Sequence, residues 1–173
     1  MPTWTQNDST AEIFTYKAGL LSRVAHDLLL KCTAFELTLE GDKVHGHFDA
    51  SSLVVIGAMK NGVVNPSTLS DKDKRDVLDN VRKHVFKRHD PKKIHFECDD
   101  LEIEDDHIEG EGTLTIPPRS HDIDFEVQIS GGKAVCEVTL HQPDWGITPF
   151  TALMGTLKIK PDIRVRMTVP WTS

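Results

Sequence analysis

Apolar and polar residues alternate with a period of two through most of the chain. In residues 123–129 (IDFEVQI) every odd position is apolar and every even position is charged or polar. This pattern is typical of a strand with one buried and one solvated face. Five further segments repeat it, with apolar rows in residues 35–39, 44–48, 108–116, 136–140 and 163–169. The chain is therefore predicted to be mainly β.

Turn-forming pairs separate the alternating segments, which predicts antiparallel pairing of neighbours: Gly41-Asp42, Asp105-Asp106, Pro117-Pro118 and Gly131-Gly132. Within residues 94–103 the apolar parity switches at Asp99-Asp100, which predicts a β-bulge that re-aims the strand. About eight such strands exceed what a flat, one-sided sheet carries comfortably, and closing the sheet removes its edges. We therefore predict an antiparallel β-barrel, with a two-sheet sandwich as the alternative.

One segment follows the helical period instead. Between Ser70 and His89, the apolar side chains of Val77, Leu78, Val81 and Val85 recur at helical spacing, and charged residues fill the other faces. Ser70 is a candidate N-cap, and Pro91 prevents the helix from continuing. The sequence predicts one amphipathic helix, which either packs with a solvated outer face or also acts as a lid across the barrel mouth.

Composition indicates one soluble domain. The chain has 173 residues, 38% of them hydrophobic and 27% charged, and a net charge of −7, so it can bury one core. We expect an N-terminal tail over residues 1–10 and a single domain over residues 11–173. No dense basic block is present, which argues against a nucleic-acid partner.

The sequence also indicates where the chain resides. No apolar run approaches the roughly 20 residues that a membrane-spanning helix needs, so the chain is predicted not to be transmembrane, while peripheral membrane contact stays open. The first residues carry no secretory signal. Cys32, Cys98 and Cys136 are odd in number and widely spaced, which predicts reduced, buried thiols in a cytoplasmic protein.

Candidates for chemistry are few. His45 and His47 share one face of a strand, but that face lies opposite Val44 and is expected to meet solvent, so no metal site is predicted. Ser22, His26 and Asp27 are close in sequence, whereas catalytic triads are assembled from separated segments. No nucleophile elbow, dinucleotide fingerprint or P-loop is present. We expect no catalytic residue and no required cofactor; a hydrolase or isomerase that uses His26 with Asp27 remains the alternative.

Five short motifs in register resemble the YceI-like polyisoprenoid-binding family. They are a Gly-Leu-Leu-Ser turn that leads to a His-Asp pair (residues 19–27), an F-x-A-x-S-L strand end (48–53), a charged helix followed by a P-x-I-x-F-type strand (91–96), a G-x-L-T-x-type strand (110–116) and a D-W-G-I region (144–147). Together they cover most of residues 11–169. The chain departs from the pattern at residues 117–120 (PPRS), where relatives commonly have an H-G-x-[TS] turn.

The resemblance implies a lipocalin-like β-barrel of about eight strands with one amphipathic helix and a short helical turn near residues 19–27. It also implies an elongated apolar cavity that takes an isoprenoid, a quinone-type lipid or a fatty-acid-like amphiphile, without enzymatic activity and often in a homodimer. Many relatives are periplasmic, whereas the missing signal favours the cytoplasm here. A scaffold or stress-response protein without a small ligand remains an alternative.

Candidate ligand contacts follow from the inward rows. Gly46, Gly110 and Gly112 fall on inward positions, where they either make room for a ligand or let the strand bend. A polar head group is expected near His26, Ser22 or Arg23; the alternative is that His26 and Asp27 hold the turn in place structurally. The apolar side chains expected to face the interior, where some contact the ligand and others only pack the core, are Phe35, Leu37, Phe48, Leu53, Phe96, Leu114, Phe125, Val138, Leu140 and Leu157.

Overall fold

The computed structural model of the chain describes residues 1–19 and 25–172. Its strands are β1 (Thr3–Thr5), β2 (Thr10–Thr15), β3 (Lys17–Ala18), β4 (Asp27–Cys32), β5 (Phe35–Glu40), β6 (Lys43–Phe48), β7 (Leu53–Lys60), β8 (Val63–Asn65), β9 (Ile94–Cys98), β10 (Glu102–Ile103), β11 (His107–Ile116), β12 (Arg119–Ser130), β13 (Lys133–His141), β14 (Thr151–Ala152), β15 (Leu157–Ile159) and β16 (Asp162–Pro170). The helical elements are η1 (Ala50–Ser52), α1 (Asp71–Asn80), η2 (Val81–Val85), η3 (Gln142–Trp145) and η4 (Leu153–Gly155).

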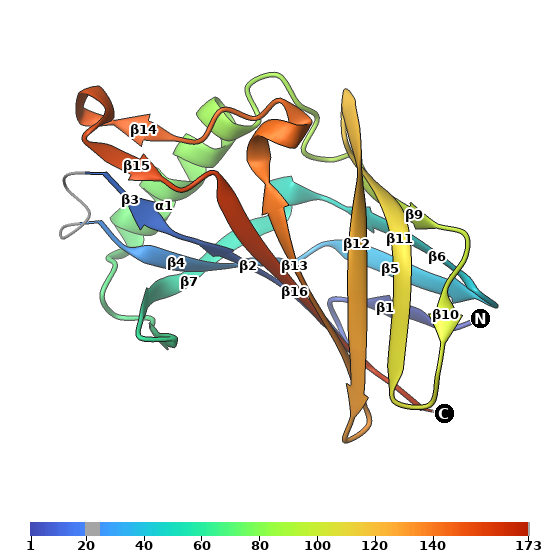
Figure 1. Cartoon of the computed structure of the whole chain (residues 1–173). Helices are drawn as coiled ribbons and strands as arrows, with labels where there is room; N and C mark the ends of the chain where they lie inside the picture. Colours follow the sequence, from blue (N-terminus) through green and yellow to red (C-terminus); the bar gives the residue numbers. More distant parts are fainter. Residues whose placement is uncertain (20–24, 173) are drawn as a thin grey trace.

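A curled antiparallel sheet makes up most of the molecule (Figure 1). It has 13 strands in the order β1-β5-β6-β9-β11-β12-β13-β16-β2-β4-β7-β8, with β10 paired to β11. A separate three-stranded sheet, β14-β15-β3, lies at one end of the curl beside α1 (Figure 1). The mainly β, antiparallel, lipocalin-like class is confirmed.

The prediction of about eight strands is too low, because several strands are too short to show a period of two. Strands β1 and β8 have three residues each and form the two ends of the sheet. Within the described part of the chain no ladder joins these two ends, so the sheet curls into a half-barrel without closing. Short edge strands limit pairing with other chains.

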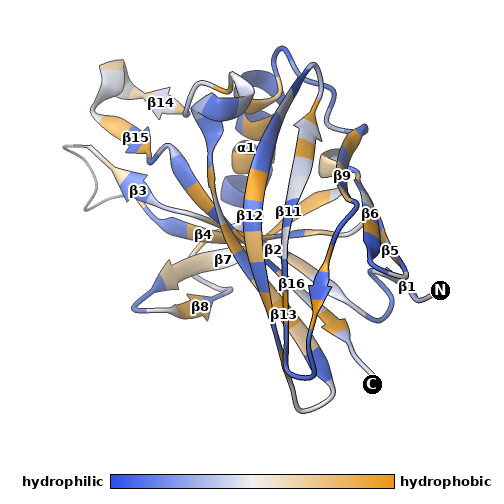
Figure 2. Cartoon of the chain, turned by 45° about the vertical axis from the view of Figure 1, so that its right-hand side comes forward, coloured by the Kyte–Doolittle hydropathy of each residue, from blue (hydrophilic) through white to orange (hydrophobic). Residues whose placement is uncertain are grey.

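The predicted turns fall where the structure has them. The pairs Gly41-Asp42, Asp105-Asp106, Pro117-Pro118 and Gly131-Gly132 each separate two paired strands. The alternation also appears in burial: along β11, Ile108, Leu114 and Ile116 are buried, while Glu109 and Glu111 are exposed. Figure 2 shows hydrophilic and hydrophobic residues interspersed along the strands of the sheet. Local turn chemistry and the period of two therefore set the register of this wall.

The prediction of a β-bulge at Asp99-Asp100 is wrong, because the strand ends before these residues. Strand β9 ends at Cys98, and only the short β10 follows. The parity switch is real, because Cys98 and Leu101 are both buried in one cluster with Ile108. A bulge does occur elsewhere, between Leu29 and Leu30 of β4, where the pairing with β7 shifts.

The predicted helix is present. Ser70 is its N-cap, and its side chain accepts a hydrogen bond from the Asp73 backbone N–H at 3.0 Å, while the Asp73 carboxylate accepts from the Ser70 N–H at 3.0 Å. This reciprocal capping box satisfies two backbone donors that the first turn leaves free. The helix continues through η2 to Val85. The short helical turn predicted near residues 19–27 falls mainly on residues 20–24, which lie outside the described residues.

The segment predicted to be an N-terminal tail contains β1, which pairs with β5. Trp4, in the middle of β1, is buried, and its ring stacks on Trp171 with ring centroids 6.1 Å apart. The Trp4 indole N–H donates to the Pro170 carbonyl at 3.1 Å. The two ends of the chain thus meet at the end of the curl away from α1 (Figure 1).

Trp145, in the D-W-G-I region, is 1% exposed. Its indole N–H donates to the Leu114 carbonyl at 2.8 Å, so the ring ties η3 to β11. Gly146 follows with a φ of 72°, a conformation that favours glycine and ends η3.

We expect Trp145→Phe to lower the free energy of unfolding by about 1–2 kcal/mol, because it leaves the Leu114 carbonyl without its buried donor and opens a small void. Equilibrium urea unfolding measures this. Trp4→Phe is the matched control: it removes a longer hydrogen bond in a less buried place and should cost less. Equal losses in the two variants would contradict the structural role given to Trp145.

Candidate functional site: an apolar cavity inside the curled sheet

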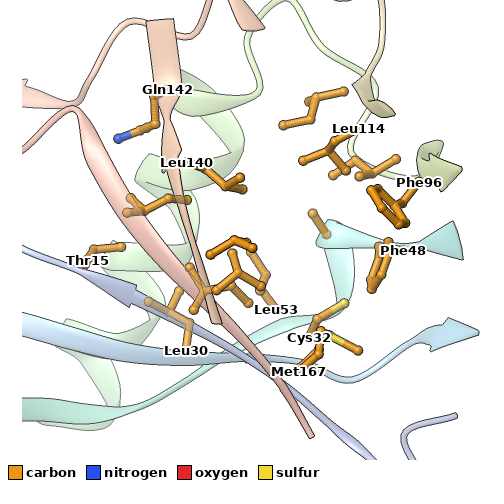
Figure 3. A pocket seen from close by; sticks show the side chains of 18 of the residues that line it. Thr15, Leu30, Cys32, Phe48, Leu53, Phe96, Leu114, Leu140, Gln142 and Met167 are labelled. Atoms are coloured by element: carbon orange, nitrogen blue, oxygen red, sulfur yellow. The ribbon is translucent and has the colours of Figure 1, made fainter. Parts of the chain in front are cut away.

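The concave face of the sheet surrounds an elongated cavity of about 550 Å³. Each long strand contributes its inward row to the wall; from β16 and the residue after it these are Ile163, Val165, Met167, Val169 and Trp171. At about 3.3 Å per residue, this row alone spans roughly 26 Å. Figure 3 shows the apolar side chains that converge on this space from several strands. The cavity is thus longer than it is wide.

The helix supplies part of the wall. Val77 and Asn80 of α1, with Val81 and Val85 of η2, line the cavity. Val77 also packs against the cluster of Leu28, Leu30 and Val55. The helix therefore covers one end of the curl with its apolar face, as its amphipathic pattern predicts.

The structure brings together most of the predicted ligand contacts. Those that line the cavity are Leu37, Phe48, Leu53, Phe96, Leu114, Phe125, Val138, Leu140 and Leu157. Phe35 is buried but lies off the wall; it stacks on Phe48, with ring centroids 6.0 Å apart, and packs on Ala11 and Cys32. His26 lies on the wall and its side chain is exposed. Ser22 and Arg23 lie outside the described residues.

The inward glycines do not make room for a ligand. The interpretation that they widen the cavity is therefore wrong. Each makes room for an aromatic ring: a Cβ on Gly46 would lie 2.9 Å from the Phe48 ring, and one on Gly110 would lie 2.7 Å from Phe125. At Gly112 the added atom would overlap the ring of Phe96. Phenylalanine rings therefore cover the glycine backbone and form the wall there.

His26 and Asp27 do not act as a pair. His26 lines the cavity and Asp27 does not; the Asp27 carboxylate accepts a hydrogen bond from the Lys17 backbone N–H at 2.8 Å. Among the described residues no hydrogen bond holds the His26 ring. The alternative of a hydrolase or isomerase that uses His26 with Asp27 therefore lacks the oriented acid that such a base needs.

The cysteines are free thiols. Cys32 and Cys136 line the cavity, whereas Cys98 is buried in the cluster around Val44. Burial raises the pKa of Cys136 to about 11, so its neutral form predominates at physiological pH. A neutral thiol behaves as a small hydrophobic group, which suits an apolar wall.

The histidines of β6 lie as predicted, away from the cavity. His47 faces His95 of β9 across the ladder, with ring centroids 6.3 Å apart, and neither ring lines the cavity. In residues 1–19 and 25–172 no cluster of three or more His, Cys, Asp or Glu side chains is placed to hold a metal ion.

No helix in the same part of the chain is long and apolar enough to cross a membrane.

Several wall residues were not predicted from the sequence. Trp4 and Trp171 line the end where the chain termini meet, and Thr15, Gln142 and Lys158 lie among the wall residues as well. Strands β1 and β15 have only three residues each, too few to show a period of two. No local pattern in the sequence therefore marks Trp4 or Lys158 as a wall residue.

A curled antiparallel sheet around an elongated apolar cavity defines the class of lipocalin-like β-proteins. Comparison with solved structures specifies the fold further. The BcnA structure from Burkholderia cenocepacia is similar with a TM-score of 0.60 and 9% sequence identity, over 95% of this chain and 96% of that one.

Campylobacter jejuni YceI structures are similar too. One has a TM-score of 0.50 and 14% identity, and a mutant has a TM-score of 0.51 and 13% identity; each comparison covers 83% of this chain and 85% of the other. The chain therefore has a YceI-like fold. No family model matches the sequence, and no curated protein matches it significantly.

Proposed function

We propose that this chain is a non-enzymatic binding protein that holds an elongated apolar ligand, such as an isoprenoid, a quinone-type lipid or a fatty-acid-like amphiphile, inside the curled sheet. The observation that carries the proposal is the cavity of about 550 Å³ with its almost wholly apolar wall. Natural ligand sites fall in this size range and are mostly apolar, with few polar groups. An apolar space of this kind excludes water and favours an apolar guest.

Energetics support the same ligand class. Side chains around an empty cavity lose dispersion contacts on one side, and a ligand that binds only the folded state raises its stability. Each methylene group moved from water into the cavity contributes about 0.8 kcal/mol. A long tail can therefore bind firmly without a set of polar anchors.

The scaffold alternative gains little support from the surface. The strongly exposed large apolar side chains among the described residues, Met1, Val54, Val63, Ile103 and Met154, belong to different elements. Singly exposed apolar residues are normal on soluble proteins. A scaffold would instead be expected to present a large contiguous apolar patch to its partners.

A chain-length series tests the proposal. Neutral n-alkanols of increasing length should displace the fluorescent probe N-phenyl-1-naphthylamine from the protein, with affinity rising roughly fourfold per methylene group until the cavity is filled. Native mass spectrometry after organic extraction gives the stoichiometry. Failure of the protein to take up the probe, or affinity independent of chain length, would overturn the proposed function.

A further inference from the structure

The charged residues on the wall of the cavity differ in sign from those of the chain as a whole. The chain has 27 acidic and 20 basic residues, yet the described residues that line the cavity include no Asp, Glu or Arg. Lys158 is the one charged residue among them, and His26 is the one histidine. A protein that is acidic as a whole therefore presents only positive or neutral groups to this space.

The polar groups gather at one end. Thr15 ends β2 and pairs with Leu28, so His26, two residues before Leu28, lies at the same end of the sheet. Gln142 follows β13 and donates to the Lys160 carbonyl at 3.2 Å. Figure 3 shows Thr15 and Gln142 on one side of the cavity and Cys32 and Met167 on another.

The opposite end is apolar. Trp4 and Trp171 stack there, beside Val169 and Ala134. The Trp4 indole N–H is already satisfied by the Pro170 carbonyl. A ligand with one polar end would therefore place its tail toward the tryptophans and its head toward Lys158.

Acid-free stretches of the described chain meet at the polar end. Residues 13–19, 25–26 and 145–161 contain no Asp or Glu. Strand pairing joins β15 to β3, where Lys158 pairs with Ala18 and Ile159 pairs with Lys17. Lys17, Lys158 and Lys160 thus lie in or next to one small sheet (Figure 1). Lys158 is exposed, so it lies at the rim of the cavity, and within the described residues it forms no salt bridge.

Two carboxylates near this end accept hydrogen bonds from backbone N–H groups. The Asp27 carboxylate accepts from the Lys17 backbone N–H. Asp73 of α1 is close enough to His26 to interact with it electrostatically, but its carboxylate is held in the capping box by the Ser70 N–H. Both carboxylates keep their negative charge, but neither lines the cavity, whereas Lys158 does.

We infer that the ligand is a single-tailed amphiphile with an anionic head group, which Lys158 and His26 bind at the rim while the tail extends toward Trp4 and Trp171. This inference rests on the proposed function and narrows it, because a neutral isoprenoid would gain nothing from Lys158. Carboxylate and phosphate head groups share the required chemistry. The experiment separates these two sources.

Displacement of N-phenyl-1-naphthylamine by dodecanoate, dodecyl phosphate and dodecanol compares one tail with three head groups. At least one of the anions should bind about tenfold more tightly than dodecanol to the unmodified protein, and the tighter anion identifies the source. Lys158→Glu should remove this advantage and leave dodecanol unaffected. Salt at about 1 M should weaken binding of the anions but not of the alcohol, because it screens partly exposed charges.

Lys133→Glu is the matched control, since it makes the same charge change at an exposed residue at the start of β13, opposite Pro170 and away from β15. The inference is overturned if dodecanol binds as tightly as both anions, or if Lys158→Glu and Lys133→Glu weaken the anions equally. Binding of dodecanol without any gain for the anions leaves the proposed function intact. If neither the probe nor any of the three ligands binds, both the inference and the proposed function are contradicted.

Discussion

Val138→Trp is expected to weaken binding of dodecanol by roughly fiftyfold. Val138 lies on β13 and lines the middle of the cavity beside Leu140 and Ile163. A tryptophan there would exclude about three methylene groups of the ligand, which corresponds to about 2–3 kcal/mol of lost burial. Because the larger ring fills empty space, the free energy of unfolding of the ligand-free protein should stay the same or rise. Probe displacement and urea unfolding measure the two effects.

Thr139→Trp is the control for this prediction. Thr139 is the next residue on the same strand, and its side chain is exposed on the outer face. The same substitution there should leave dodecanol affinity within about twofold, because adjacent strand residues face opposite sides. Equal weakening by the two variants, or unchanged binding in Val138→Trp, would place the ligand outside the cavity.

Features that depend on neighbouring residues were predictable from the sequence. The period of two fixed which residues of β11 and β12 face inward, and the glycine and proline pairs gave the turns between strands. The helix was equally accessible, since Ser70 and the spacing of Val77, Val81 and Val85 are local signals. These features need only contacts between residues close in sequence.

Features that depend on distant contacts were not predictable. Strand β1 is too short to show a period, and Trp4 is buried only because Trp171, from the other end of the chain, stacks on it. The break after Cys98 is another case: the parity switch was visible, but a bulge and a strand end give the same switch. Lys158 reaches the cavity wall only through the pairing of β15 with β3.

The inward glycines show the same limit at the level of single atoms. A glycine in a strand shows that a side chain is missing at that position, but the sequence does not show which group fills the space. At Gly46 and Gly110 the occupants are the rings of Phe48 and Phe125. The sequence could therefore place these glycines on the inner face, whereas only the structure assigns them to packing and not to ligand space.

Gly112 should be the least replaceable of these glycines. A Cβ at this position would overlap the Phe96 ring and would lie 2.8 Å from the backbone oxygen of Glu97. The ring has little freedom to move, because it packs edge-on against Phe125 with centroids 5.5 Å apart. We expect Gly112→Ala to lower the free energy of unfolding by about 2–3 kcal/mol, the cost typical of overpacking a close-packed site, as measured by urea unfolding.

Gly110→Ala is the matched comparison on the same strand. Its added methyl group would meet Phe125 and Leu101 at 2.7 and 3.0 Å, and both contacts are to ends of side chains, which can shift. A cost of about 1 kcal/mol is expected there.

In Gly112→Ala combined with Phe96→Leu the smaller side chain relieves the overlap, so the pair should cost less than the sum of the single changes by about 1 kcal/mol. The contact with the Glu97 carbonyl persists in the double variant, so the recovery should be incomplete. Strict additivity, or equal costs at Gly110 and Gly112, would show that the Phe96 ring does not require the glycine.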